Sequence, residues 1–126
     1  MSAKILIVDD EQFVRELLAK ILRKKGHDAR PVADAEEALR QLAAERFDLV
    51  LTDVVMPGMD GFDLLRKIKG LHPDVKVVVL TGYARKQSIS DFLLYGADEY
   101  LAKPFQVTEL LAAVDRAAGK SSPTTA

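Results

Sequence analysis

Short β-branched apolar runs alternate with segments of helical period along the chain, and this alternation restricts the possible fold more than any other feature of the sequence. The apolar runs fall at five places: Lys4 to Val8, Ala29 to Val32, Leu49 to Thr52, Val75 to Leu80 and Glu99 to Ala102. Between them, apolar residues recur at spacings of three, four and five, as in Phe13, Leu17, Leu18, Ile21 and Leu22. Such spacing is typical of amphipathic helices, so the pattern predicts five strand–helix units.

The apolar runs favour a parallel sheet over an antiparallel one. Runs such as Ile5 to Val8 and Val77 to Leu80 are continuously apolar, as expected for strands that are covered on both faces. Because strand–helix–strand crossovers are right-handed, helices reach both faces if the chain reverses its winding once. We therefore expect an α/β fold of the (βα)5 type, with a doubly wound five-stranded parallel sheet in the order 2-1-3-4-5 and helices on both faces.

The length and the helix-end signals indicate one domain and a short tail. A chain of 126 residues corresponds to about one domain. We expect this domain to span residues 1–118, followed by a flexible tail or the start of a linker over residues 119–126, which read GKSSPTTA. Asp34 is expected to cap a helix, with Glu37 completing a capping box. Four glycines stand where helices should end, namely Gly26, Gly70, Gly96 and Gly119.

Composition and charge exclude several classes of function. The chain has no cysteine, which rules out disulfides, thiolate catalysis and cysteine-ligated metals. Its net charge is -1, which provides no overall field for a polyanion, so we expect no direct nucleic-acid binding. Its longest apolar runs have four or five residues, so we expect no membrane-spanning segment and a cytoplasmic location. We expect His27 and His72 to be exposed loop residues.

Polar side chains follow four of the five expected strands. Asp9 and Asp10 come after the first strand, Asp53 after the third, Thr81 after the fourth and Lys103 after the fifth. Ligands of doubly wound sheets bind at the carboxyl edge, where the strand order reverses, so Asp9, Asp10 and Asp53 should converge there. Carboxylates at close range repel one another unless a cation lies between them. Oxygen ligands without histidine or cysteine favour Mg²⁺.

These residue types point to phosphoryl transfer. The ammonium of Lys103 and the hydroxyl of Thr81 can both donate to phosphoryl oxygens. Asp53 stands alone after its strand and is the candidate nucleophile, while metal and lysine would neutralise the charge that develops on the phosphoryl group. The tight loop after Asp53 can bring a backbone carbonyl near Val55 to the metal. Each residue alone is a weak signal, because aspartate also caps helices and turns.

The chain resembles the receiver domain of two-component response regulators, the CheY-like family. The resemblance rests on ILIVDDE, DLVLTDVVMPGMDGFDLL, VVVLTGYA, GADEYLAKPF and a closing amphipathic helix, and it covers about residues 4 to 118. It implies that Asp53 accepts phosphate from the phosphohistidine of a sensor histidine kinase or a phosphotransfer protein. It also implies that Asp9, Asp10, Asp53 and the Val55 carbonyl organise Mg²⁺.

The same resemblance implies further roles. Thr81 and Lys103 would contact the phosphoryl group, the Lys103–Pro104 peptide would be cis, and Tyr100 would be an aromatic switch residue. A downstream effector, or a second activated copy in a homodimer, would read the switched surface. Such a domain catalyses its own phosphorylation and dephosphorylation and has no other enzymatic activity. Val55 and Tyr83 are apolar and aromatic where the family often carries polar groups, which predicts a long-lived phosphorylated state.

Three alternatives have distinct requirements. A Mg²⁺-dependent phosphohydrolase of the haloacid dehalogenase type carries Asp-x-Asp after its first strand, whereas this chain has Asp9 next to Asp10. A flavin- or nucleotide-binding module needs a Gly-rich or Ser/Thr-rich turn there, and DDEQF is acidic without glycine. Finally, the chain is either a stand-alone regulator or the receiver of a longer transcription factor or output enzyme, and the tail fits both.

Overall fold

Five parallel strands form one sheet in the order β2-β1-β3-β4-β5. The computed structural model describes residues 2–53, 61–82, 93–94 and 96–119. The strands are β1 (Lys4–Val8), β2 (Asp28–Val32), β3 (Leu49–Asp53), β4 (Lys76–Thr81) and β5 (Glu99–Ala102). The fold class and the strand order predicted from the sequence are confirmed.

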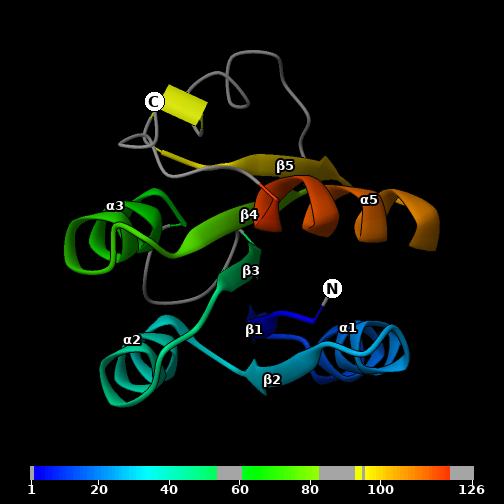
Figure 1. Ribbon diagram of the computed structural model, residues 1–126, viewed down its shortest axis with the longest axis horizontal. Coiled ribbons are helices and arrows are strands. Elements are labelled where there is room, and N and C mark those ends of the chain that lie inside the picture. The colour runs from blue at the N-terminus through cyan, green and yellow to red at the C-terminus, as the bar shows by residue number, and fades with distance from the viewer. Residues whose placement is uncertain (1, 54–60, 83–92, 95, 120–126) are drawn as a thin grey trace.

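Helices cover both faces of this sheet. They are α1 (Gln12–Lys24), α2 (Ala35–Ala44), α3 (Gly61–Leu71) and α5 (Val107–Ala118). Figure 1 shows α2 and α3 on one side of the sheet and α1 and α5 on the other. The segment between β4 and β5, where the sequence predicts a fourth helix, lies largely outside the described residues.

The two faces of the sheet bury separate apolar cores, as the alternation of side chains along a strand requires. In β1, Leu6 and Val8 face the core beneath α2 and α3. Ile5 and Ile7 face the core beneath α1 and α5. All four side chains are fully buried, which is why this strand reads as a continuous apolar run.

The helix ends agree with most of the sequence signals and correct two of them. Asp34 caps α2, because its Oδ1 accepts a hydrogen bond of 2.8 Å from the Glu37 N–H. The Glu37 carboxylate bonds to Arg40 and Gln41, so among the described residues the reciprocal bond of a capping box is not formed. Gly70 lies inside α3, which continues to Leu71, so this glycine does not end the helix as the sequence predicts.

Candidate functional site

Among the described residues, three side chains that end a strand or directly follow one at the carboxyl edge of the sheet are both polar and buried. Asp9 directly follows β1, Asp53 ends β3 and Thr81 ends β4, and their exposed fractions are 0%, 6% and 2%. Asp53 lies in register with the penultimate position of β4, and Thr81 lies beside Ala102 at the end of β5. Buried polar groups are costly unless they are paired, so their concentration at one edge marks a site with a chemical purpose.

Lys103 links the two buried carboxylates. Its Nζ donates to Asp53 Oδ2 at 2.6 Å and lies 3.9 Å from Asp9 Oδ2. Its backbone N–H donates to the Thr81 carbonyl at 2.8 Å, and the Lys103–Pro104 peptide bond is cis. Burial lowers the pKa of Lys103, but the hydrogen bond and the charge of Asp53 outweigh burial, so the pKa is raised overall. The ammonium is therefore firmly charged at this edge.

Within the part of the chain that the structure describes, Asp9 forms three hydrogen bonds and keeps one carboxylate oxygen without a donor. Its N–H donates to the Val32 carbonyl at 3.2 Å, its carbonyl accepts from Arg15 Nη1 at 2.9 Å, and its Oδ1 accepts from the Glu11 N–H at 2.9 Å. Among the described residues, no donor bonds to its buried Oδ2. Burial raises the pKa of Asp9, and the bond from Glu11 and the charge of Lys103 do not fully offset it.

The acidic turn after β1 offers oxygen ligands for a cation. One carboxylate oxygen from each of Asp9, Asp10 and Glu11 lies within 4.8 Å of the others, and Asp10 and Glu11 are exposed. Carboxylate oxygens alone suit Mg²⁺, which keeps several waters. The buried Oδ2 of Asp9, to which no described residue donates, suits a metal ligand. Asp53 is joined to this group through Lys103.

The structure thus brings together Asp9, Asp53, Thr81 and Lys103, as the sequence indicates, and it adds one residue that the sequence motifs do not single out. Glu11, which the sequence places directly after Asp10, joins the acidic group. The added residue is Arg15, which bonds to the carbonyl of Asp9. The sequence carries no local signal for this contact, because it depends on the angle at which α1 leaves the strand.

The remaining predicted site residues lie elsewhere or outside the described residues. Tyr100 lies in β5, opposite Val79 of β4, and 37% of it is exposed. Val55 and Tyr83 fall outside the described residues. A cavity of about 770 Å³ opens at the amino ends of the strands, where His72 is among the lining residues, so it does not coincide with the carboxyl edge.

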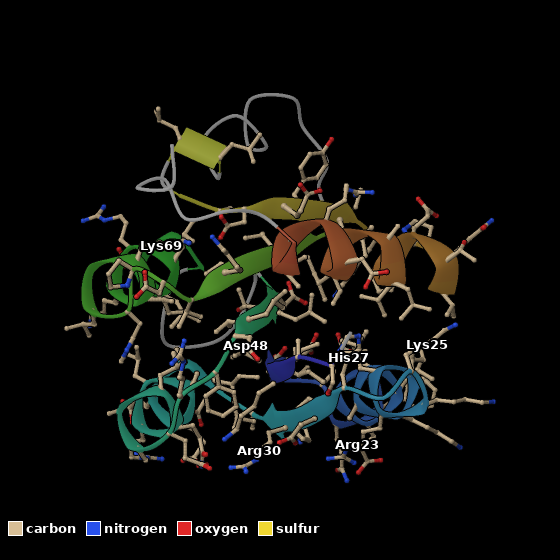
Figure 2. All side chains as sticks on the ribbon, in the orientation of Figure 1. Arg23, Lys25, His27, Arg30, Asp48 and Lys69 are labelled. Carbon is tan, nitrogen blue, oxygen red and sulfur yellow. The ribbon has the colours of Figure 1, made fainter. Side chains whose placement is uncertain are left out.

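His27 corrects an expectation from the sequence. It is 8% exposed, and its Nδ1 accepts a hydrogen bond of 3.0 Å from the Ala3 N–H. The preceding glycine has a φ of 92°, a left-handed conformation that favours glycine and turns the chain so that His27 packs beneath the N-terminal segment. His27 directly precedes β2, and Figure 2 shows it beside α1. His72 is half-buried.

Comparisons with known proteins agree with this geometry. The family model described as the response regulator receiver domain matches residues 5–115. The response regulator protein FleR of Pseudomonas aeruginosa is 42% identical over 116 residues, which cover 92% of this chain and 24% of FleR. Sporulation initiation phosphotransferase F of Bacillus subtilis is 37% identical, with 92% of this chain and 94% of that protein covered.

A solved structure shows the same likeness in three dimensions. The chemotaxis protein CheY4 of Vibrio cholerae superposes with a TM-score of 0.87 at 29% identity, covering 93% of this chain and 99% of that one. The chain spans about a quarter of the length of FleR. Within the described residues, no helix is long and apolar enough to cross a membrane. These likenesses do not favour a phosphohydrolase.

Proposed function

The chain belongs to the family of response regulator receiver domains of two-component systems, and from this premise we propose that Asp53 is its phosphoacceptor. The donor would be the phosphohistidine of a sensor histidine kinase or a phosphotransfer protein. The observation that carries the proposal is the contact of 2.6 Å between Lys103 Nζ and Asp53 Oδ2. It places a fixed positive charge on the carboxylate that would attack phosphorus.

The reaction needs a nucleophile and compensation of negative charge. A carboxylate oxygen of Asp53 forms the new bond to phosphorus, and the bond between phosphorus and the histidine nitrogen of the donor breaks. The ammonium of Lys103 then faces the added phosphoryl oxygens as well as Asp53, which favours the more negative product. The β4 end holds Thr81 close to this group, because its carbonyl accepts a hydrogen bond from the Lys103 backbone.

The acidic turn would hold the Mg²⁺ on which the reaction depends. Asp9 and Asp10 would hold the ion together with Asp53, and the Val55 carbonyl is proposed as a further ligand. Bound Mg²⁺ supplies positive charge that screens the carboxylates and the incoming phosphoryl group from one another. Glu11 lies close enough to the pair to contribute an oxygen, directly or through water.

Phosphorylation would switch the surface that includes β5 and α5. Thr81 ends β4, which pairs with the strand that carries Tyr100, so a phosphoryl group that attracts Thr81 acts on the element next to Tyr100. A ligand shifts such an equilibrium only through contacts that differ between the two states. The partner that reads this surface would be an effector or a second activated copy. This chain matches only 24% of FleR, as expected if the effector belongs to the same polypeptide. It matches 94% of phosphotransferase F, as expected if the effector is a separate protein.

The proposal is tested by labelling with a small phosphodonor. The protein is incubated with acetyl phosphate and Mg²⁺, and its intact mass is measured. We expect the mass of one phosphoryl group to be added to the wild type, none to Asp53→Asn, and none to the wild type with a chelator. The matched control is Asp48→Asn, which lies just before the other end of β3 (Figure 2) and retains an oxygen that can accept from the Lys4 N–H. Labelling of Asp53→Asn at the wild-type rate would refute the proposal.

A further inference from the structure

Arg15 makes a contact that neither the sequence motifs nor the proposed chemistry accounts for. Its side chain reaches back from the second turn of α1 and donates from Nη1 to the backbone carbonyl of Asp9 at 2.9 Å. Arg15 is half-buried, and its own N–H bonds to the Glu11 carbonyl at 3.0 Å. The guanidinium thus ties the helix to the turn that carries the acidic group.

The bond completes the fixation of Asp9 from two sides. On the sheet side, the N–H of Asp9 bonds to Val32 of β2. On the helix side, its Oδ1 bonds to the Glu11 N–H and its carbonyl bonds to Arg15. Among the described residues, Oδ2 is the hydrogen-bonding atom of Asp9 that is left without a donor. The bonds of the N–H, the carbonyl and Oδ1 together fix the direction in which Oδ2 points.

We propose that Arg15 is a positioning residue for Mg²⁺ binding: it fixes the backbone of Asp9 so that Oδ2 is presented as a ligand. The proposal rests on the proposed function, because the group that Oδ2 would bind is the Mg²⁺ of that reaction. Residues that orient a ligand from outside the coordination sphere commonly change metal affinity by about 10- to 100-fold when they are replaced. Arg15 would act in this way through a backbone carbonyl.

A purely electrostatic role for Arg15 predicts the opposite result. A guanidinium beside Asp9, Asp10 and Glu11 repels an incoming cation, because like charges repel at these distances. If charge were its main effect, loss of Arg15 would strengthen Mg²⁺ binding. If positioning is its main effect, loss of Arg15 weakens Mg²⁺ binding although the net charge becomes more negative. The sign of the change therefore separates the two roles.

The test compares Arg15→Gln and Arg15→Lys with a matched control on the same helix. Arg23, labelled in Figure 2, also donates from its guanidinium to a backbone carbonyl, that of Ala29, at 3.1 and 2.7 Å. Arg23→Gln thus removes the same kind of bond away from the acidic turn. Mg²⁺ affinity is measured by calorimetry. Amide hydrogen exchange at the Glu11 N–H is measured in chelator, with no metal present.

We expect Arg15→Gln to weaken Mg²⁺ binding by about 10-fold or more and to speed exchange at Glu11 without metal. Arg15→Lys, which retains a donor and the charge, should recover part of both losses, and Arg23→Gln should change neither. The inference is overturned if Arg15→Gln exchanges at the Glu11 N–H as slowly as the wild type, or if it binds Mg²⁺ as tightly as the wild type. A wild type that binds no Mg²⁺ refutes the proposed function instead, and the exchange of Glu11 then still decides whether Arg15 positions Asp9.

Discussion

Replacing Asp9 by asparagine should have opposite effects on stability with and without Mg²⁺. Asp9 is fully buried, and among the described residues its Oδ2 bonds to no donor. The ammonium of Lys103 lies 3.9 Å from this oxygen. Because the pKa of Asp9 is raised despite that cation, the cost of burying the charge exceeds the attraction. Without metal, the ionised carboxylate therefore destabilises the folded protein.

A buried polar group without a partner costs about 1–3 kcal/mol when it is neutral and more when it is charged. Asparagine still buries a neutral amide at this place, so Asp9→Asn removes only the excess cost that the charge adds. The attraction of Lys103 offsets part of this cost, so we expect Asp9→Asn to raise the free energy of unfolding by about 1 kcal/mol in chelator at pH 7. A raised pKa means that the folded state holds the proton more tightly than the unfolded state. The destabilising contribution of Asp9 therefore shrinks as pH falls through its folded pKa, and the advantage of the variant over the wild type shrinks with it.

Bound metal should reverse the order. A ligand at 100 times its dissociation constant stabilises the folded state by about 2.7 kcal/mol, and the wild type should gain this while Asp9→Asn gains little. Thermal unfolding at neutral pH, in chelator and in saturating Mg²⁺, measures both effects, with a shift of about 3–5 °C expected per kcal/mol. The control is Asp10→Asn, because the Asp10 carboxylate is exposed. This variant should lose the stabilisation by Mg²⁺ but should be no more stable than the wild type in chelator. An Asp9→Asn variant that is no more stable in chelator, or as strongly stabilised by Mg²⁺ as the wild type, would refute this reasoning.

Two further predictions concern the switch and the lifetime of the phosphorylated state. Thr81→Ala should leave labelling of Asp53 largely intact but uncouple it from the switch. With a beryllofluoride mimic, NMR shifts at Tyr100 should then be lost while those near Asp53 remain; wild-type shifts that never reach Tyr100 would show that the mechanism is wrong. Val55→Asn and Tyr83→Glu should each accelerate loss of phosphate after the donor is removed, because a polar group can orient the attacking water, and one such hydrogen bond of about 1.4 kcal/mol changes the rate tenfold. Equal or slower decay in the double variant would exclude control by these two positions.

The sheet could be predicted because each strand is marked by its own run of apolar residues, and several residues in each run carry the same signal. Each residue of β1 from Ile5 to Val8 is fully buried, so the whole strand is apolar and its identity does not depend on register. The order of the strands is constrained by the handedness of crossovers. Once that order is fixed, Asp9, Asp53 and Lys103 must meet at one edge, and this arrangement accounts for the contacts of Lys103 with both carboxylates.

The contacts that the sequence did not indicate depend on packing between elements. The bond from Arg15 to the Asp9 carbonyl requires the helix to leave the strand at one angle. The burial of His27 requires the segment before β1 to lie over it, where Ala3 donates to its ring. Glu37 has competing partners in Arg40 and Gln41 on its own helix, so it does not complete the predicted capping box. In each case several local geometries suit the sequence, and tertiary contacts select one.

The central claim is that Asp53 is the residue that carries the phosphoryl group, and reductive trapping tests it most directly. Borohydride reduces an aspartyl phosphate to homoserine, which records the position of the modification in the peptide. After incubation with acetyl phosphate and Mg²⁺, the protein is reduced, digested and sequenced by tandem mass spectrometry. We predict homoserine at position 53 and unchanged aspartate at positions 9 and 10. Homoserine at either of those two positions, with aspartate intact at position 53, would contradict the claim.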